Sequence, residues 1–205
     1  MIKIKFTLPY ILYGLTLVPT ANAHADDVTG SAAAKPKNGT CISLDTSNPT
    51  HCKTSGCAVI YVFSDGTQLK RQGGTRAWRN SNPGNLRYSE KTRKSGAIGQ
   101  AGGFAVFPHE AAGLQALENL LLSDSYKDLT IADAICKYAP PHENNTNGYK
   151  AYIKRTTGLN LTKKIAALNT QELKKVIDAI RVIEGWKTGQ EIKIAAPLQA
   201  KQKSI

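Results

Sequence analysis

Acidic side chains are scarce in this chain of 205 residues, where 15 Asp and Glu stand against 27 Lys and Arg. The formal charge is +12, and no Glu precedes Glu90. Such a basic chain suits an anionic partner such as a cell wall, an outer-membrane surface or a nucleic acid, although a plain solvated basic surface has the same composition. Because no basic helix interleaved with aromatic residues is present, we expect no nucleic-acid partner.

Motifs of several well-known chemistries are also missing. The chain has no GxSxG sequence, no CxxC pair, and no glycine-rich loop that continues into Lys-Ser or Lys-Thr. His51, His109 and His142 are scattered, and none has a metal-ligating partner four residues later. These absences argue against a serine hydrolase, a zinc site and a nucleotide-binding loop. We therefore expect an activity that uses no metal and no cofactor.

Long apolar runs are absent beyond the N-terminus. Residues 6–20 (FTLPYILYGLTLVPT) form an apolar stretch after Lys3 and Lys5. The stretch is shorter than the roughly 20 residues that span a bilayer, and small residues suited to cleavage follow it. This pattern predicts an export signal over residues 1–25, cleaved after Ala23 or Ala25. We expect a periplasmic or secreted mature protein with no stable membrane span.

Cysteines are few but even in number: Cys41, Cys52, Cys57 and Cys136. In an oxidising compartment an even count favours two disulfides, and three connectivities are open. The first three lie close together in sequence, so we expect at least one bridge among them. A cysteine peptidase built on Cys136 and His142 is a weaker alternative, because the even count favours bridged cysteines.

The composition divides the chain into successive parts. Residues 26–40 are small and polar and predict a flexible leader. Residues 41–74 predict a small disulfide-linked β unit, because AVIYVF (58–63) is followed by the turn sequence SDGT and the returning strand QLKRQ. Residues 191–205 predict a basic tail.

Helical periodicity dominates residues 75–190, which predict the main domain. Its strongest pattern is HEAAGLQALENLLLS at 109–123, with leucines at helical spacing. The fold class that follows is α+β and mainly α, with an N-terminal disulfide-stapled β-hairpin. Three further helices are expected, one from the cap Thr130 to the stop APP at 139–141, one over 147–157 capped by Gly158, and one from the cap Thr170 to Gly185.

Turn-forming residues are concentrated in RNSNPGNLR at 79–87. Pro83 sets φ, and Gly84 is free to take a positive φ. This stretch is consistent with a well-made loop that enters an extended segment. It is equally consistent with a rigid loop that lines a cleft and offers amides and an arginine to a carboxylate-bearing ligand. A glycine-rich stretch, SGAIGQAGGFAVFP at 95–108, follows it and ends in a short β-like run.

The order of these motifs carries a resemblance. NPGNLRY, GAIG, GGFAVFP, EAAGLQALENLL and YAPPHENNTNGYKAYI together resemble a lysozyme-like domain of phage tail proteins and secreted bacterial proteins. They are also similar to the latter part of bacterial glucosaminidase domains. The resemblance covers about residues 75 to 187. It implies an α-rich lysozyme-like fold and cleavage of the glycan strand of peptidoglycan.

That chemistry needs a carboxylic acid with a raised pKa. In lysozyme-like enzymes the acid ends a helix that precedes the β-like segment, whereas here no Glu precedes Asn82. Glu184 in IRVIEGW continues an apolar helical stripe at a helix end, where the helix dipole raises a carboxyl pKa. We therefore expect Glu184 to be the acid of a circularly rearranged domain. In the structural alternative, Glu184 pairs with Arg181 or another basic residue, or accepts backbone N–H bonds from the NPGN turn.

Glu143 in PPHENNTNGY is the second catalytic candidate, and a helix-capping role is its alternative. If both carboxyls face one cleft, their separation indicates inverting or retaining hydrolysis, and Glu184 acting alone suits a lytic transglycosylase. A non-catalytic wall-binding module is the alternative to an enzyme. The biological role is open between opening the sacculus for a secretion or conjugation machine and attacking a competitor. The expected substrate-binding residues are Asn82, Asn85, Arg87, Tyr88, Phe104, Asn144 and Tyr149.

Overall fold

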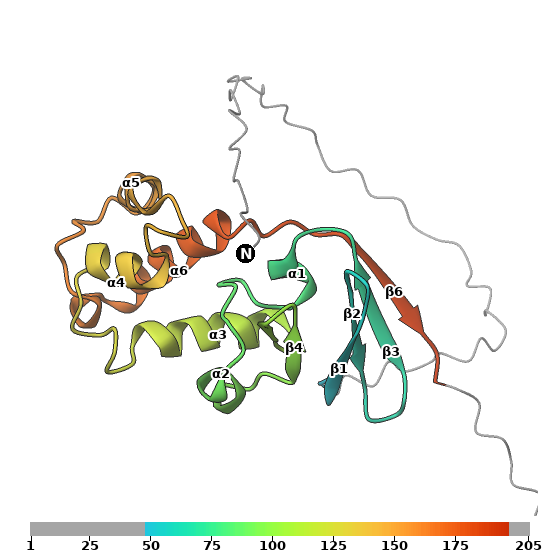
Figure 1. Cartoon of the computed structure of the whole chain (residues 1–205). Helices are drawn as coiled ribbons and strands as arrows, with labels where there is room; N and C mark the ends of the chain where they lie inside the picture. The colour runs from blue at the N-terminus through green and yellow to red at the C-terminus, as the bar shows by residue number, and fades with distance from the viewer. Residues whose placement is uncertain (1–47, 197–205) are drawn as a thin grey trace, which may run out of the picture. The chain divides into compact units, whose positions relative to one another are not determined.

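The computed structural model describes residues 48–196 (Figure 1). Helices take up 39% and strands 19%, so this part of the chain is a mixed α/β structure. The predicted signal (1–25), the leader (26–40) and Cys41 lie outside the described residues, as do residues 197–205 of the predicted tail.

The largest sheet has four antiparallel strands in the order β1-β2-β3-β6. The hairpin of β2 and β3 matches the two strands expected from the alternating pattern. β6 corrects the prediction of a basic tail from residue 191, because it pairs along the free edge of β3, as Figure 1 shows at the right. The strands are His51–Ser55 (β1), Ala58–Val62 (β2), Gln68–Gln72 (β3) and Gln190–Ile194 (β6).

Within residues 48–196, no disulfide joins the strands of this sheet. Cys52, Cys57 and Cys136 are free, and no bridge joins any two of them within residues 48–196. The predicted disulfide-stapled hairpin is therefore not supported. The strand ladders and a small apolar cluster hold the sheet, and Cys52 lies in that cluster, where burial raises the pKa of its thiol. The buried members of the cluster are Val59, Tyr61 and Val106.

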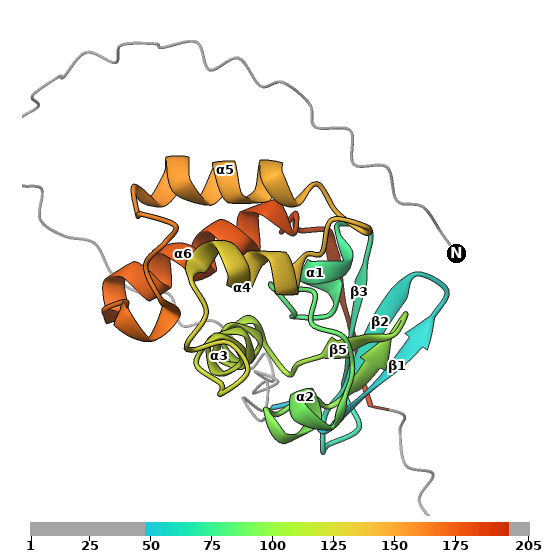
Figure 2. The same ribbon diagram turned by 60° about the vertical axis from the view of Figure 1, so that its left-hand side comes forward.

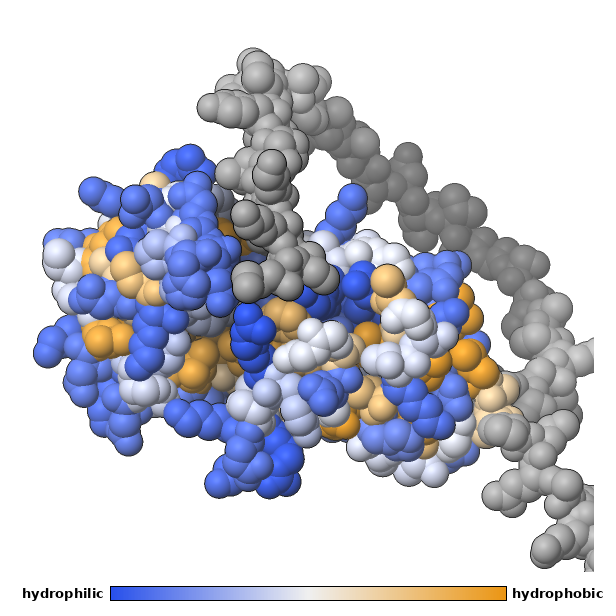
Figure 3. Space-filling view, viewed as in Figure 1, coloured by the Kyte–Doolittle hydropathy of each residue, from blue (hydrophilic) through white to orange (hydrophobic). Residues whose placement is uncertain are grey.

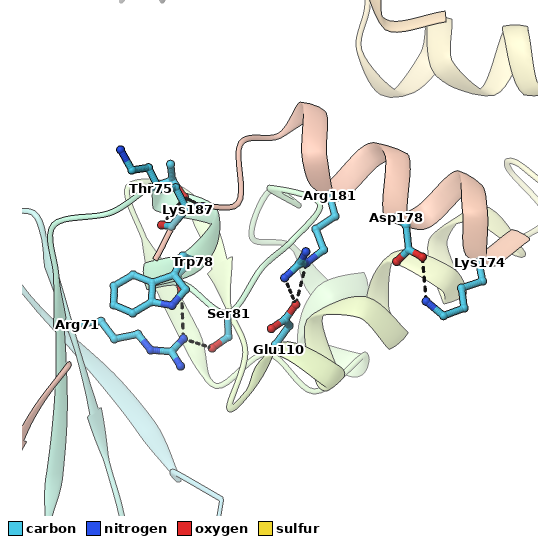
Figure 4. Close-up of polar contacts among 9 residues, drawn as sticks. All are labelled: Arg71, Thr75, Trp78, Ser81, Glu110, Lys174, Asp178, Arg181 and Lys187. Carbon is cyan, nitrogen blue, oxygen red and sulfur yellow. Dashed lines mark hydrogen bonds and ion pairs between the residues drawn. The ribbon is translucent and has the colours of Figure 1, made fainter. Parts of the chain in front are cut away.

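Tyr61 ties the sheet to the loop that follows it. Its hydroxyl donates to the Arg79 carbonyl at 2.7 Å and lies 2.9 Å from the Ser81 hydroxyl. Arg71 of β3 donates to the same Ser81 hydroxyl at 2.7 Å and to the Trp78 carbonyl at 2.9 Å (Figure 4). Burial raises the pKa of Tyr61 to about 12, so its hydroxyl keeps its proton at physiological pH. The sheet and the loop therefore share one buried polar junction.

Four longer helices enclose the main apolar core, whose fully buried members include Leu117, Ile135, Ile153 and Ile180. α6 packs against both α5 and α3, and α4 packs against α5 (Figure 2). The four helices are Glu110–Leu121 (α3), Ile131–Tyr138 (α4), Thr146–Thr157 (α5) and Thr170–Ile183 (α6).

Shorter elements connect these helices to the sheet. Three of them, α1, α2 and η1, have too few residues to show a periodic pattern, so the sequence does not predict them. The hairpin of β4 and β5 follows α2 and leads into α3. The short elements are Arg76–Arg79 (α1), Glu90–Lys94 (α2), Gly99–Ala101 (β4), Phe104–Val106 (β5) and Ile165–Ala167 (η1).

The helix caps follow the expected chemistry with one correction. Thr130 caps α4 by accepting from the Asp133 amide at 3.1 Å, and Gly158 ends α5 with φ +70°. The cap of α6 is Asn169 and not Thr170. Its side chain accepts from the Glu172 amide while Glu172 accepts from the Asn169 amide, each at 2.9 Å. This reciprocal pair satisfies two amides at once, so Thr170 becomes the first helical residue.

The loop between α1 and α2 is held from inside by Asn82, whose side chain is fully buried. Its amide nitrogen donates to the carbonyls of Leu86 and Ala105, and its oxygen accepts from the Leu86 amide, all at 2.9 Å. The expected positive φ at Gly84 is wrong, because Asn85 takes it with φ +45°. Gly84 is needed for space: a Cβ there would lie 2.9 Å from the Tyr138 hydroxyl.

A second glycine, Gly113, lets α3 lie directly on this loop. A Cβ at Gly113 would come within 2.1 Å of the Ser81 carbonyl oxygen and 2.7 Å of the Pro83 ring. Both of those positions are buried, so neither has room to move away. The contact between helix and loop therefore depends on a residue without a side chain.

We expect Gly113→Ala to destabilise the protein by about 1–3 kcal/mol, because the added methyl overpacks the contact with Ser81. Helix propensity alone has the opposite sign and favours Ala over Gly by about 1 kcal/mol. Urea unfolding followed by circular dichroism measures the change, with Gln115→Ala on the exposed face of the same helix as the control. A stabilised Gly113→Ala protein would mean that α3 does not press on the loop.

Candidate active site

Glu184 is the C-cap of α6 and is fixed on both sides along the chain. On one side, Arg181 donates from Nε to Glu110 Oε1 at 2.7 Å and so ties α6 to α3. On the other side, the Lys187 amide donates to Thr75 Oγ1 at 3.1 Å, and the Thr75 amide donates to the Lys187 carbonyl at 3.0 Å (Figure 4). The pairing of Glu184 with Arg181, one of the structural alternatives, is therefore not what the structure shows.

The carboxyl of Glu184 accepts one side-chain hydrogen bond on each oxygen. Asn85 Nδ2 donates to Oε2 at 2.9 Å, and the Tyr149 hydroxyl donates to Oε1 at 3.2 Å. The contact with the NPGN turn is thus made by the Asn85 side chain, and not by a backbone N–H as the other structural alternative has it. Three segments far apart in the sequence meet at this carboxyl: the loop before α2, helix α5 and the end of α6.

Arg76 of α1 contacts the side chain of Asn85 and orients its amide group. Arg76 Nε donates to Asn85 Oδ1 at 3.4 Å, which leaves the NH₂ group of Asn85 directed at Glu184. The guanidinium also lies 3.6 Å from the centre of the Phe104 ring, a cation–π contact that fixes the arginine. Arg76 is not predictable from the sequence, because no motif links residue 76 with residue 184.

Burial of Glu184 raises the pKa of its carboxyl, while the hydrogen bonds from Asn85 and Tyr149 and the charge of Arg76 act in the lowering direction. Burial wins, so the net pKa lies above the ordinary glutamate value. A carboxyl that keeps its proton more readily than usual is suited to general acid chemistry. Burial also raises the pKa of Tyr149 well above that of an ordinary tyrosine, so its hydroxyl stays a donor.

Tyr149 is held by an aromatic partner. Its ring meets that of Tyr138 edge to face, with the centroids 6.3 Å apart and an interplanar angle of 72°. The Tyr138 hydroxyl in turn donates to the Gly84 carbonyl. The two tyrosines therefore connect α4 and α5 to the loop that presents Asn85.

Glu143, the second catalytic candidate, is exposed and bound elsewhere. Its carboxylate accepts from Arg87 at 3.5 Å and lies 3.5 Å from His142 Nε2. Asn145, and not Glu143, caps α5, by accepting from the Gly148 amide at 3.0 Å. The capping alternative for Glu143 is therefore wrong.

The other predicted substrate-binding residues are spread around this centre. Asn82 is fully buried with its bonds made inside the protein, so it supports the loop and has no exposed surface for a ligand. The guanidinium groups of Arg76 and Arg87 both lie over the Phe104 ring, 3.6 and 5.5 Å from its centre. Within the described residues, no hydrogen bond joins Tyr88 or Asn144 to the Glu184 carboxyl.

No protein-family model, curated protein or solved structure matches this chain. Between residues 48 and 196, no helix is long and apolar enough to cross a membrane. The same residues bring together no group of three or more His, Cys, Asp and Glu that could hold a metal ion. Function is therefore inferred from the residues around Glu184.

Replacing Tyr149 with Phe removes a hydrogen bond that favours the charged carboxylate, so we expect the pKa of Glu184 to rise further. Carbon-13 NMR of the side-chain carboxyl, recorded as a function of pH, measures this change without any assay of activity. Tyr152→Phe on the same helix is the matched control and should leave the Glu184 titration where it is. A lower or unchanged pKa in Tyr149→Phe would contradict the hydrogen bond.

The raised pKa of Glu184 also has a consequence for stability. The folded protein binds the Glu184 proton more tightly than the unfolded chain does. The resulting contribution to the free energy of unfolding is fully present below the pKa that Glu184 has in the unfolded chain. It is lost as the pH rises through the folded pKa. We expect Glu184→Gln to remove this loss, so that the variant gains stability relative to the wild type as the pH rises. Urea unfolding at a series of pH values tests it, with the exposed Glu143→Gln as control; a parallel pH dependence in wild type and Glu184→Gln would refute it.

Proposed function

We propose that the protein is an exported enzyme that cleaves the glycan strand of peptidoglycan, with Glu184 as the general acid. The observation that carries the proposal is the partly buried Glu184 carboxyl, fixed by Asn85 and Tyr149 and raised in pKa. The basic composition of the chain is consistent with an anionic wall as substrate.

The expected step is proton transfer to the glycosidic oxygen. As the bond between the anomeric carbon and that oxygen breaks, the Glu184 proton passes to the leaving oxygen and the carboxyl becomes negative. The donors Asn85 and Tyr149 are already in place for that developing charge, so they stabilise the transition state more than the ground state. Water, or the 6-hydroxyl of the sugar itself, then captures the anomeric carbon and returns a proton to Glu184.

The position of Glu143 bears on which of these acceptors is used. Its carboxylate is exposed and is paired with the guanidinium of Arg87. This supports a mechanism with Glu184 as the single acid, which is the lytic transglycosylase type, over a two-carboxyl muramidase.

The resemblance to lysozyme-like domains enters the proposal through the position of α6. In lysozyme-like enzymes, the helix that ends in the catalytic acid comes before the β-like segment. In a circularly rearranged domain, the last helix must take the place of that helix beside the NPGNLR loop. The bond from Asn85 to Glu184 is the contact that this rearrangement requires.

The alternative is a non-catalytic wall-binding module with the same architecture. One observation favours it: both oxygens of Glu184 already accept bonds that stabilise the carboxylate, as a purely structural glutamate would. Activity measurements separate the two proposals.

Digestion of purified sacculi tests the catalytic proposal. We expect Glu184→Gln to lower the rate of fragment release by about 10²–10⁴-fold, the usual contribution of a general acid. Glu143→Gln, which removes an exposed carboxylate, should cost far less. Mass spectrometry of the fragments identifies the reaction: anhydro-sugar ends indicate a transglycosylase, and reducing ends indicate hydrolysis.

The controls concern folding and binding. Circular dichroism and sacculus sedimentation show whether each variant is folded and still binds the wall. If the wild type binds sacculi and releases nothing, the enzyme is ruled out in favour of the wall-binding module.

A further inference from the structure

A cavity of about 410 Å³ lies between α2 and α3, and none of its lining residues is among the side-chain hydrogen-bond partners of Glu184, which are Asn85 and Tyr149. Its volume falls within the range of roughly 300–1,000 Å³ typical of small-ligand sites. The floor is apolar and consists of Leu86, Ala116 and Leu120. A ligand seated here would bury small aliphatic groups against that floor.

The rim of the cavity carries positive charge without acidic residues. Arg87, Lys91 and Lys94 line it, and no Asp or Glu is among the lining residues. Lys91 makes no ion pair within the described part of the chain. Lys94 lies 3.8 Å from Glu90, a carboxylate that Arg93 already holds at 2.7 Å. In Figure 3 the surface over α2 is strongly hydrophilic, beside apolar patches over α3.

The ligand that matches this cavity combines carboxylates with small aliphatic side chains. We propose that the cavity binds the stem peptide of peptidoglycan, with the carboxylates on the Lys91 and Lys94 side and the methyl groups on the apolar floor. This inference rests on the proposed function for the choice of ligand. Arg87 and Lys94 already lie near Glu143 and Glu90, whereas Lys91 makes no ion pair within the described residues. An uncharged sugar of the glycan would leave Lys91 without an anionic partner, so the peptide is the better match.

Arg87 connects the cavity to the Glu184 site. Its side chain lines the cavity, and its guanidinium also lies 5.5 Å from the centre of the Phe104 ring. The guanidinium of Arg76, which orients Asn85 toward Glu184, lies over the same Phe104 ring. A series of side-chain contacts through Phe104, Arg76 and Asn85 thus links the edge of the cavity to the Glu184 carboxyl. Strands that carry peptides should therefore be better substrates than bare strands.

Direct binding tests the cavity without any need for catalysis. The probe is the stem tetrapeptide released from sacculi by an amidase, titrated into nitrogen-15-labelled mature protein. We expect amide shifts in residues 86–95 and 116–123, and a loss of affinity of about fivefold in the double variant Lys91→Gln, Lys94→Gln, because exposed charge pairs are individually weak. The control Lys154→Gln, Lys174→Gln removes the same charge from α5 and α6 and should bind like the wild type.

Absence of shifts at about 10 mM peptide, or an equal loss in both double variants, would overturn the inference. This result does not depend on whether Glu184 is catalytic, so it separates failure of the cavity from failure of the proposed function.

Digestion then connects the cavity to activity. We expect the ratio of cleavage rates on intact and amidase-stripped strands to favour intact strands in the wild type. That ratio should fall about fivefold in the Lys91→Gln, Lys94→Gln protein and stay unchanged in the Lys154→Gln, Lys174→Gln control. Equal cleavage of both substrates by the wild type would count against the cavity while leaving the acid in place.

Discussion

The buried side-chain amide of Asn82 is the contact on which the rest of the site depends. Its three bonds close the loop onto itself and onto β5, so the loop keeps one shape. That shape brings Ser81 to the sheet and to α3, and it presents Asn85 to the end of α6. Loss of this side chain would leave the buried Leu86 amide without its acceptor, at a cost of about 1–3 kcal/mol. The loop is thus a rigid part of the core that happens to reach the surface at Asn85.

The Glu184 carboxyl shows a balance between burial and hydrogen bonding. Burial favours the protonated form, and the donors around it favour the charged form. Because the two effects oppose each other, the free-energy difference between the protonated and charged forms of Glu184 stays small. An acid that must give up a proton and take it back needs this kind of environment. Anchors before and after Glu184 along the chain keep the carboxyl in place while its charge changes.

Much of the secondary structure follows from local patterns. The extents of α3, α4 and α5 were predictable because leucine spacing, a threonine cap and a glycine stop all act within one helix. Glu184 stood out because an acid on an apolar stripe is costly unless it is bonded. The partners of Glu184 are harder to predict from the sequence. Asn85 lies 99 positions away, and Arg76 belongs to a helix that is too short to show a periodic pattern. β6 was missed because its strand exists only where β3 offers a free edge.

The pairing of β3 with β6 has a consequence for the topology of the chain. Gln72 faces Gln190 across the ladder, and a Cβ on Gly74 would lie 2.6 Å from the Gly189 nitrogen. The chain between them, which includes every helix of residues 48–196, therefore leaves the sheet and returns to it at one point. The two ends of the helical part are neighbours in space, so its first and last segments can exchange places in the sequence without moving in the structure. An acid near the end of the chain and a loop near its middle become adjacent for the same topological reason.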